Sequence, residues 1–469
     1  MLERTSRWWR QPAGGREVLI VALPMVISSL SWTVMTFVDR MFLKWVSPEA
    51  MAASFSASII WFSLTSLPLG VCAYTNSFVS QYNGDQQPRE IGPIVWQAIW
   101  IAVILTPILL LANPLAPFLF DLADHDKGIR VDEVRYFQAL NWGAGGMLVS
   151  QAAQTFYSGR GKTLMVMIVD SLFAALNVGL DYVWIFGYWG FPEAGAAGAG
   201  YATAVAMWLK ALTYLLLLIR KKNRENFNTG SFRFDLKRWL RLWRFGGPSG
   251  LQMVLDVIGF TSFVIFVGRL GPIQSAATTM AFSVSTLAFM PIWGLGMAAG
   301  ILVGQHLGEN NPKLAGRASW NSLGIGMFYM AAISLLYILV PQVFLSGFVA
   351  SDSAKGSNDE IARLATTLLQ FVAAYNLFDA SLTILVSAIK GAGDTQFVLW
   401  VSLIMAAVLG LLSWIAVEKI HAGLFGCWIL IVGWVWVLGT VYFLRFLQGK
   451  WKTMRVIEMK HTEPVHSAE

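Results

Sequence analysis

The chain has 469 residues, of which 56% are hydrophobic and only 13% are charged, and its formal net charge is +7. This composition excludes a soluble globular protein, because so few charged residues cannot cover the surface of one. In a membrane protein a charge of +7 reports the orientation of the loops, so no nucleic-acid partner is expected.

Twelve apolar segments are long enough to cross the ~30 Å hydrocarbon core of a bilayer as helices. In chain order they lie near Leu19 to Leu43, Ala52 to Val79, Gly92 to Ala112, Val134 to Phe156, Leu164 to Phe186, Ala194 to Ile219, Phe245 to Val267, Ala276 to Val303, Ala318 to Val340, Ile361 to Ala388, Phe397 to Val417 and Leu424 to Leu447. The predicted fold is therefore an all-α integral membrane protein with twelve transmembrane helices. Irregular backbone is expected within three of these spans, at Pro24, Pro68 and Pro291.

An internal repeat divides these spans into two sets of six. The segment Val79 to Gly92, VSQYNGDQQPREIG, recurs 224 positions later as VGQHLGENNPKLAG. Duplication on this scale in an apolar chain is typical of transporters built from two pseudo-symmetric halves. We predict an N-terminal six-helix lobe at 1–219, a basic linker at 220–244, a C-terminal six-helix lobe at 245–447 and a tail at 448–469.

The distribution of basic residues predicts the orientation in the membrane. The two tails and the loops on their side carry 23 of the 34 lysine and arginine residues. Both termini are therefore expected in the cytoplasm, with the protein in the plasma (inner) membrane. Within the linker, Trp239 and Trp243 with interleaved arginines predict an amphipathic helix on the inner leaflet, with membrane lipids as its partners.

Several other functions are excluded by missing residues. Cys72 and Cys427 both lie in apolar stretches, so we expect packing residues and no disulfide. The run Ser158 to Thr163, SGRGKT, lacks the first glycine of a phosphate-binding loop, because that position is Phe156. Transport would then be driven by an ion gradient rather than by ATP. We expect no cofactor and no obligate protein partner.

An enzyme is also not expected. A metal-dependent intramembrane enzyme would need ligands in the membrane, and all five histidines are expected in loops or the tail. These are His125, His306, His421, His461 and His466.

Five acidic residues fall at membrane depth, where each costs at least ~2.5 kcal/mol and needs a reason. They are Asp39, Asp170, Asp181, Asp256 and Asp379. Residues that only build the shared scaffold should recur in both copies of the repeat. The positions equivalent to Asp39, Asp181, Asp256 and Asp379 hold no acid. This asymmetry favours a specialised role over a scaffolding one.

Helical spacing groups these acids with polar neighbours. Asp170, Asn177 and Asp181 are seven and four residues apart, which places them on one helix face. Tyr375 and Asp379 are i and i+4, so an aromatic ring and a carboxylate project together. Such a pair suits an organic cation, which gains both Coulomb and cation–π attraction. The structural alternative for each acid is a buried hydrogen-bonded group or an ion pair with a nearby base.

In this order and spacing, the residues of the N-terminal half resemble those of multidrug and toxic compound extrusion (MATE) transporters, and within them the NorM branch. Leu23-Pro24, followed by Phe37-Val38-Asp39, is similar to the first span of the family. Asn177-x-x-x-Asp181 with Ile185-Phe186-Gly187 is similar to its fifth span. The Gly-(Asp/Glu)-x-x-Pro loop after spans two and eight agrees with this resemblance.

The C-terminal half carries the same resemblance. Tyr375-x-x-x-Asp379, leading into Lys390-Gly391-x-Gly393-Asp394-Thr395, is similar to the tenth span and its turn. Asp256 stands where NorM-type members carry a glutamate, and Arg40 follows Asp39 where a small polar residue is commoner. The first departure would alter a cation site, and the second would hold the Asp39 carboxylate ionised.

The resemblance implies cation-coupled antiport, with Na⁺ or H⁺ as the coupling ion, that exports organic and usually cationic drugs or toxic compounds by alternating access. The expected ion or cation site of the C-terminal lobe is Asp256 and Asp379 with Tyr375, and Na⁺ is one candidate ion there. Asp39, Asn177 and Asp181 would form a second polar site, with Asp170 as a further candidate, and Pro24 would act as a hinge. The alternatives are a lipid-precursor flippase of the same superfamily and an ion-coupled carrier of one specific solute.

Overall fold

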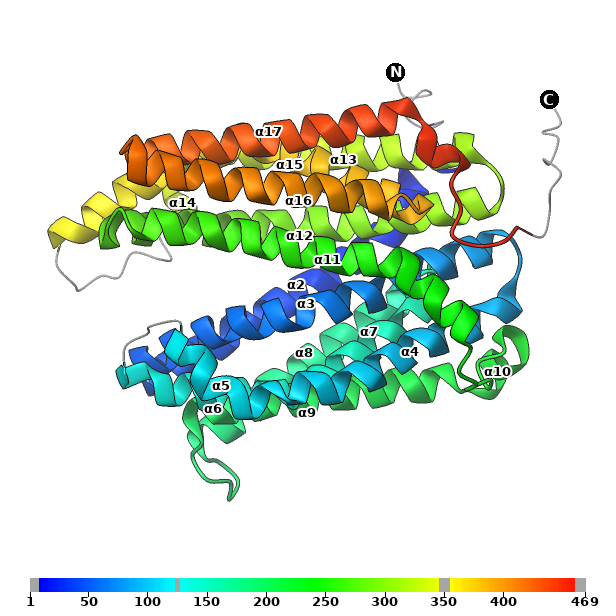
Figure 1. Cartoon of the computed structure of the whole chain (residues 1–469), viewed down its shortest axis with the longest axis horizontal. Helices are drawn as coiled ribbons and strands as arrows, with labels where there is room; N and C mark the ends of the chain where they lie inside the picture. Colours follow the sequence, from blue (N-terminus) through cyan, green and yellow to red (C-terminus); the bar gives the residue numbers. More distant parts are fainter. Residues whose placement is uncertain (1–7, 123–126, 346–354, 460–469) are drawn as a thin grey trace. The chain divides into compact units, whose positions relative to one another are not determined.

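The structure is a computed structural model that describes residues 8–122, 127–345 and 355–459, and within these residues it contains helices and no strand. The α-helices are α2 (Gly15–Val46), α3 (Pro48–Gly84), α4 (Pro88–Leu110), α5 (Ala112–Leu122), α6 (Lys127–Asn141), α7 (Ala144–Ser158), α8 (Thr163–Phe186), α9 (Gly195–Leu218), α10 (Lys221–Phe227), α11 (Leu236–Gly268), α12 (Pro272–Gly308), α13 (Pro312–Leu339), α14 (Pro341–Leu345), α15 (Lys355–Ala392), α16 (Thr395–Trp414) and α17 (Gly423–Gln448) (Figure 1). A π-helical turn, Ile415–Lys419, extends α16, and a 3₁₀ turn, Lys450–Thr453, follows α17.

Eleven helices in the described part of the chain are long and apolar enough to cross a membrane, which confirms the all-α membrane fold. The fourth predicted span differs, because it is divided into α6 and α7 at Trp142–Gly143. At the break, the Asn141 side chain donates to the Leu109 carbonyl at 2.9 Å. A Cβ on Gly143 would lie 2.7 Å from the backbone of Ala204 on α9, so only glycine allows this close approach.

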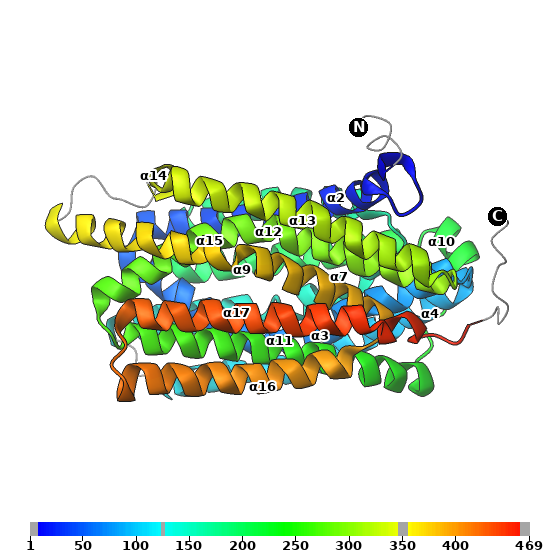
Figure 2. The same cartoon turned by 90° about the horizontal axis from the view of Figure 1, so that it is seen from above.

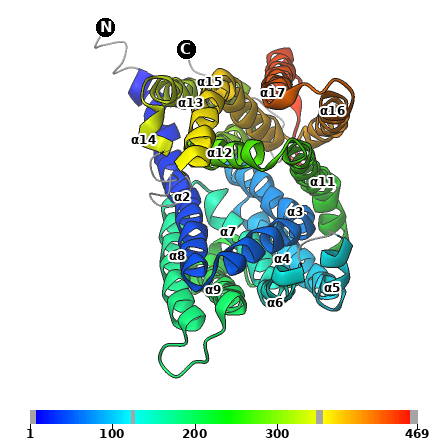
Figure 3. The ribbon, with the colours of Figure 1, turned by 90° about the vertical axis from the view of Figure 1, so that its left-hand side faces the viewer.

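The helices form two compact units. The N-terminal unit comprises the described residues within 27–254, 308–310 and 456–459. Within it, α8 packs against α9, α6 and α7 pack against α9, and α3 packs against α4 (Figure 3). Gly187 ends α8 with φ of 73°, a left-handed conformation that glycine adopts at little cost.

The C-terminal unit comprises the described residues within 8–26, 255–307 and 311–455. In it, α15 lies between α13 and α17 and packs against both (Figure 2). The start of α2 belongs to this unit, where Val18, Val21 and Ala22 are buried in one apolar cluster with residues of α12, α13 and α15. His306 is buried in the last turn of α12, 3.4 Å from Glu17, so the expectation that this histidine lies in a loop was wrong. His421 does lie in the turn before α17, whereas His125, His461 and His466 lie outside the described residues.

The three prolines do not break their helices. The α-helices α2, α3 and α12 continue through Pro24, Pro68 and Pro291, so the expected irregular backbone is absent at these described positions. Helix α2 is nevertheless shared between the units, and the division falls after Val26, two residues beyond Pro24.

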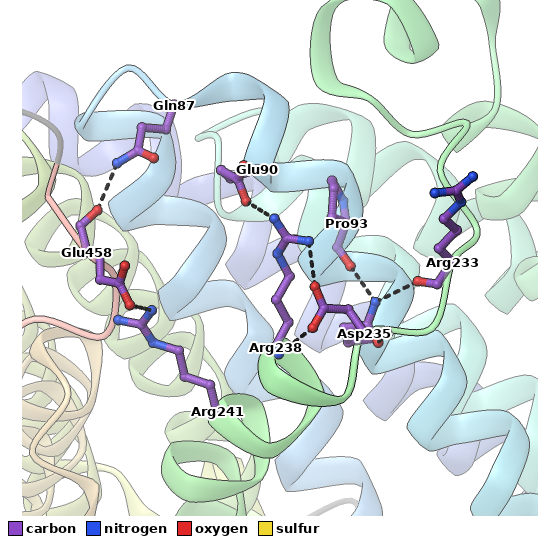
Figure 4. Close-up of polar contacts among 9 residues, drawn as sticks. Gln87, Glu90, Pro93, Arg233, Asp235, Arg238, Arg241 and Glu458 are labelled. Carbon is purple, nitrogen blue, oxygen red and sulfur yellow. Dashed lines mark hydrogen bonds and ion pairs between the residues drawn. The ribbon is translucent and has the colours of Figure 1, made fainter.

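The linker is attached to α4. Trp239 and Trp243 lie in the first turns of α11, so the predicted helix is present and continues into the seventh span. Its contact with the inner leaflet stays a prediction. The Gln97 side chain donates to the carbonyls of Pro93 and Arg233 and accepts from the amide of Asp235 (Figure 4).

An ion-pair network extends this attachment. Arg238 pairs with Glu90 at 2.6 Å and with Asp235 at 2.8 Å (Figure 4). The linker is therefore held to α4 by backbone, side-chain and charge contacts together.

The chain end after α17 is also bound within the N-terminal unit. The amide of Val456 donates to Gln81 Oε1 at 2.9 Å, and Val456 is fully buried. Gln87 donates to the carbonyl of Glu458, whose carboxylate pairs with Arg241 at 3.1 Å (Figure 4). Residues 456–458 therefore contact three segments of this unit, which are α3, the turn after it and α11.

Candidate functional site

The N-terminal unit brings Asp39, Asn177 and Asp181 together in its interior. Asp39 lies on α2, and the other two lie one turn apart on α8. Asp39 is 6% exposed, whereas Asn177 and Asp181 are fully buried. The two helices are joined nearby by a hydrogen bond of 2.9 Å between Ser31 and Ser171. The spacing of four residues on α8 is what points both side chains to α2.

The Asn177 amide connects the two acids. In the orientation that satisfies both of its ends, its nitrogen donates to Asp181 at 3.0 Å and to Asp39 at 3.3 Å. Its oxygen accepts from the Thr203 hydroxyl of α9 at 3.2 Å. The two carboxyl groups also lie close enough to interact electrostatically.

The pair of Asp39 and Asp181 lacks enough hydrogen-bond donors and counterions to stabilise two ionised carboxylates. Asp181 Oδ1 has no hydrogen-bond partner among the described residues. Two ionised carboxylates this close in a buried site would repel each other strongly. The pair can therefore hold one proton or one other cation, and it changes charge by one when that cation leaves.

Arg40, next to Asp39 in the sequence, interacts with it electrostatically but is not ion-paired with it. The guanidinium of Arg40 lies over the Phe55 ring, 4.8 Å from its centroid. Arg40 forms no ion pair with any residue that the structure describes, so its adjacency in sequence does not produce a salt bridge with Asp39. The buried phenol of Tyr136, on α6, lies close enough to Asp39 and Asp181 to interact with both electrostatically.

Asp170 shares a helix face with Asp181 but has a different environment. Its carboxylate pairs with Lys210 of α9 at 2.8 Å, accepts from the Tyr214 hydroxyl at 3.1 Å and accepts from Ser28. Asp170 is thus a satisfied ion-paired acid. A small cavity of about 50 Å³ lies beside it, with Trp32, Phe173, Thr203 and Lys210 among its lining residues.

In the C-terminal unit, Tyr375 and Asp379 project from the same face of α15, as their spacing predicts. Tyr375 is 6% exposed, and its hydroxyl is 3.3 Å from that of Ser285 on α12. Asp379 is half-buried and forms no hydrogen bond or ion pair within the described residues. Its carboxylate therefore has no internal counterion within the described chain.

Asp256 lies on the exposed side of α11 and interacts electrostatically with Lys390. Lys390 is eleven residues beyond Asp379 on the same helix, or about 16 Å along its axis. Asp256 thus interacts with a residue near the C-terminal end of α15, about 16 Å along the helix from Asp379. The grouping of Asp256 with Asp379 in one site stays a prediction.

Comparison with known proteins decides the family. The family model MatE matches residues 24–183 and 248–414, one match for each half of the chain. The chain belongs to the MatE family. This confirms the resemblance drawn from the sequence, and the MatE chain is a multi-pass membrane protein.

Relatives of this MatE chain cover almost its whole length. It is 25% identical to a probable multidrug resistance protein NorM of Brucella suis over 95% of both chains. It is 27% identical to the multidrug resistance protein NorM of Aliivibrio fischeri, over 88% of this chain and 90% of that one. A solved MOP superfamily transporter from Pyrococcus furiosus, described as having reverse polarity of its binding pocket, shares the fold with a TM-score of 0.84 at 21% identity, over 96% and 98% of the two chains.

Sequence reasoning about this MatE chain did not identify four polar residues as neighbours of the acids. Lys210 and Lys390 are basic groups at or near membrane depth, and a search that included bases as well as acids would have found the first within the sixth span. Thr203 and Tyr136 carry no such signal, because isolated hydroxyl groups are ordinary in membrane helices. Only packing places them beside the acids.

Proposed function

We propose that this protein exports organic, predominantly cationic, drug-like compounds by antiport with H⁺. Membership of the MatE family and the multidrug resistance names of the NorM relatives support export of small molecules. The protein would work in the plasma (inner) membrane with both termini in the cytoplasm, by transport and without catalysis. The observation that carries the proposal is the buried carboxyl pair of Asp39 and Asp181.

This pair can couple two fluxes because it binds one positive charge at a time. A carboxylate in an apolar interior is unfavourable unless a proton, a metal cation or a cationic ligand compensates it. When a proton occupies the pair, its attraction for a cationic compound falls. Exclusive occupancy of this kind is sufficient to couple export of the compound to entry of the proton.

The polar groups around the pair favour H⁺ over Na⁺. Sodium is held by several oxygen atoms that replace its hydration shell. Here the Asn177 amide presents its nitrogen to the carboxylates, and the Thr203 hydroxyl is directed to the Asn177 oxygen. In this orientation the Asn177 amide offers N–H in place of an oxygen ligand, which favours a proton over a metal ion at the pair.

We assign Tyr375 and Asp379 to substrate binding. The Asp379 carboxylate has no internal partner in the described chain, and the Tyr375 ring lies one turn away on α15. An organic cation would gain Coulomb and cation–π attraction from this pair. Pro24 would let α2 bend as Asp39 changes charge, because proline removes one helical hydrogen bond.

The test is dye efflux from proteoliposomes under separately imposed H⁺ and Na⁺ gradients. We expect the unmodified protein to respond to the H⁺ gradient and not to the Na⁺ gradient. Asp39→Asn and Asp181→Asn should each abolish that response, because they remove the titrating charge and keep the side-chain volume. Asp121→Asn, which removes an exposed acid, is the matched control and should transport normally.

Two results would overturn the proposal. Efflux driven equally by H⁺ in both carboxyl variants would separate coupling from the pair. Efflux driven only by Na⁺ would show that H⁺ is not the coupling ion. Asp256 and Asp379 would then be the candidate coupling residues.

A further inference from the structure

A cavity of about 310 Å³ lies where α7, α8, α9 and α10 meet, on the side of the N-terminal unit that carries the linker. It is lined by Tyr157, Lys162, Met165, Arg220, Lys222 and Asn223. Its volume is at the lower end of the ~300–1,000 Å³ range of small-ligand sites. Lys162 comes from the SGRGKT run that resembled an incomplete phosphate loop in the sequence.

The cavity is strongly basic. Three of its lining residues are cationic and none is acidic. None of Lys162, Arg220 and Lys222 forms an ion pair with any residue in the described part of the chain. Like charges that converge without a counterion repel one another, so an anion bound among them would be favoured. The end of the 24-residue helix α8 at Thr163 adds the partial positive charge of a helix N-terminus.

The walls of the cavity are held in place by contacts that leave its charges free. Asn223 donates to the Leu217 carbonyl at 2.8 Å and to the Tyr157 hydroxyl at 3.4 Å. The Tyr157 hydroxyl, on a side chain that is 9% exposed, can still donate its own proton to a ligand.

A second contact fixes α10 beside the cavity. The Arg160 guanidinium lies between two rings, 3.7 Å from the centroid of Phe156 on α7 and 4.2 Å from that of Phe227 on α10. It also donates to the Phe156 carbonyl at 2.7 Å. The two helices are therefore clamped together through one cation. Because α10 begins beside Arg220 and contains Lys222, this clamp sets where two of the cavity's charges lie.

Exposed apolar residues lie along α8 and α9, the helices next to the cavity. Leu164, Ile168 and Leu172 follow one another at intervals of four along α8, and they are 58%, 51% and 60% exposed. On the neighbouring α9, Leu212 and Leu216 are 50% and 56% exposed. A soluble anion would make no use of this surface, whereas the acyl chains of a phospholipid would lie along it.

We propose that this cavity binds the phosphate headgroup of an anionic phospholipid, with the acyl chains along the exposed face of α8 and α9. The shared chemistry of all candidate ligands is a phosphate group held by two lysines, one arginine and a phenol. Basic pockets between transmembrane helices on the cytoplasmic side commonly hold anionic headgroups. This inference rests on the cavity and the exposed face of α8 and α9, and it stands or falls independently of the proposed transport mechanism.

The experiment is native mass spectrometry of delipidated full-length protein titrated with single lipids. The probes are dioleoylphosphatidylglycerol, dioleoylphosphatidylcholine and, as a soluble phosphate, glycerol 3-phosphate. We expect one phosphatidylglycerol to bind at least tenfold more tightly than phosphatidylcholine, and glycerol 3-phosphate not to compete at the same concentration.

Two matched triple variants separate the cavity from general surface charge. The cavity variant is Lys162→Gln, Arg220→Gln, Lys222→Gln, and the control variant is Lys221→Gln, Arg233→Gln, Lys237→Gln. Each removes two lysines and one arginine that are exposed at the same end of the unit. One basic residue near an anionic lipid is worth about a fivefold change in affinity, so the cavity variant should lose ~100-fold and the control less than about twofold.

Three outcomes would overturn the inference. Equal losses in both triple variants would mean diffuse surface attraction only. Full competition by glycerol 3-phosphate would identify a soluble phosphate site instead of a lipid site. If the triple cavity variant does not fold, the single changes Lys162→Gln and Tyr157→Phe decide, and phosphatidylglycerol affinity unchanged in both would exclude the cavity.

Discussion

The ion pair between Lys210 and Asp170 offers the sharpest test of the packing in the N-terminal unit. The two groups are 2.8 Å apart, and their side chains are 22% and 11% exposed. Asp170 also accepts hydrogen bonds from Tyr214 and Ser28. Replacing Lys210 by methionine keeps the aliphatic length of the side chain but leaves the Asp170 charge without its counterion.

The expected loss of stability lies between two known limits. Breaking a fully buried pair costs about 3–5 kcal/mol, whereas an exposed pair contributes about 0–1 kcal/mol. The Lys210–Asp170 pair is mostly buried, but two hydroxyl groups still support the carboxylate. We therefore expect Lys210→Met to cost about 2 kcal/mol and Asp170→Asn a similar amount. The double variant should cost only about 1–2 kcal/mol, because no charge is then left unpaired, so the coupling energy is about 2–3 kcal/mol.

Thermal unfolding of the detergent-purified protein measures this cycle. A loss of 2 kcal/mol should lower the apparent Tm of each single variant by roughly 4–8 °C, with the double variant not additive. The exposed pair of Arg130 and Asp121, with side chains 34% and 54% exposed, is a control whose cycle should give less than about 1 kcal/mol. A coupling energy for Lys210 and Asp170 no larger than that of the control pair would refute the reasoning.

Three further predictions concern orientation, bending and substrate binding. A single cysteine at Gly230 should react with impermeant reagents only from the cytoplasm and one at Trp189 only from outside, against a low background because both native cysteines are buried; the reverse pattern would invert the topology. Pro24→Ala should insert normally but slow efflux at least about tenfold, because restoring the helical hydrogen bond favours the straight helix by up to ~3 kcal/mol; a normal rate would remove the hinge. Asp379→Asn should raise the apparent KM for a cationic dye at least about tenfold while the response to an H⁺ gradient persists, and Asp256→Asn should change that KM little; the opposite ranking would move the substrate site to α11.

Periodicity and length were enough to predict the helices and the candidate acids. The i, i+4 spacing of Asn177 and Asp181 fixed their common direction, and the cost of a carboxylate in a membrane helix marked both Asp181 and Asp39 for attention. These arguments use properties of one helix at a time. They could say that the acids face inward but not which acids meet.

What the sequence could not provide depends on contacts between helices. The pairing of Asp170 with Lys210 brings together residues forty positions apart on two helices. The break at Gly143 lies inside an apolar run that is long enough to be one span, and it is explained only by the backbone of α9 beside it. The same limit applied to Trp239, whose arginine-rich surroundings predicted a helix but not that this helix continues into the seventh span.

The division of α2 after Val26 has a consequence for how the protein is made. The C-terminal unit takes in the first described residues of the chain, up to Val26, and then nothing more until Leu255. At typical synthesis rates of ~5–20 residues per second, the intervening residues take roughly 10–45 seconds to emerge. The N-terminal unit also waits, since Gln81 receives the Val456 amide only when almost the whole chain has been translated. Neither unit can therefore complete its packing before the ribosome has translated the residues around Val456. Until then, folding intermediates in the membrane must persist while the first part of α2 and the buried side chain of Gln81 lack their final contacts.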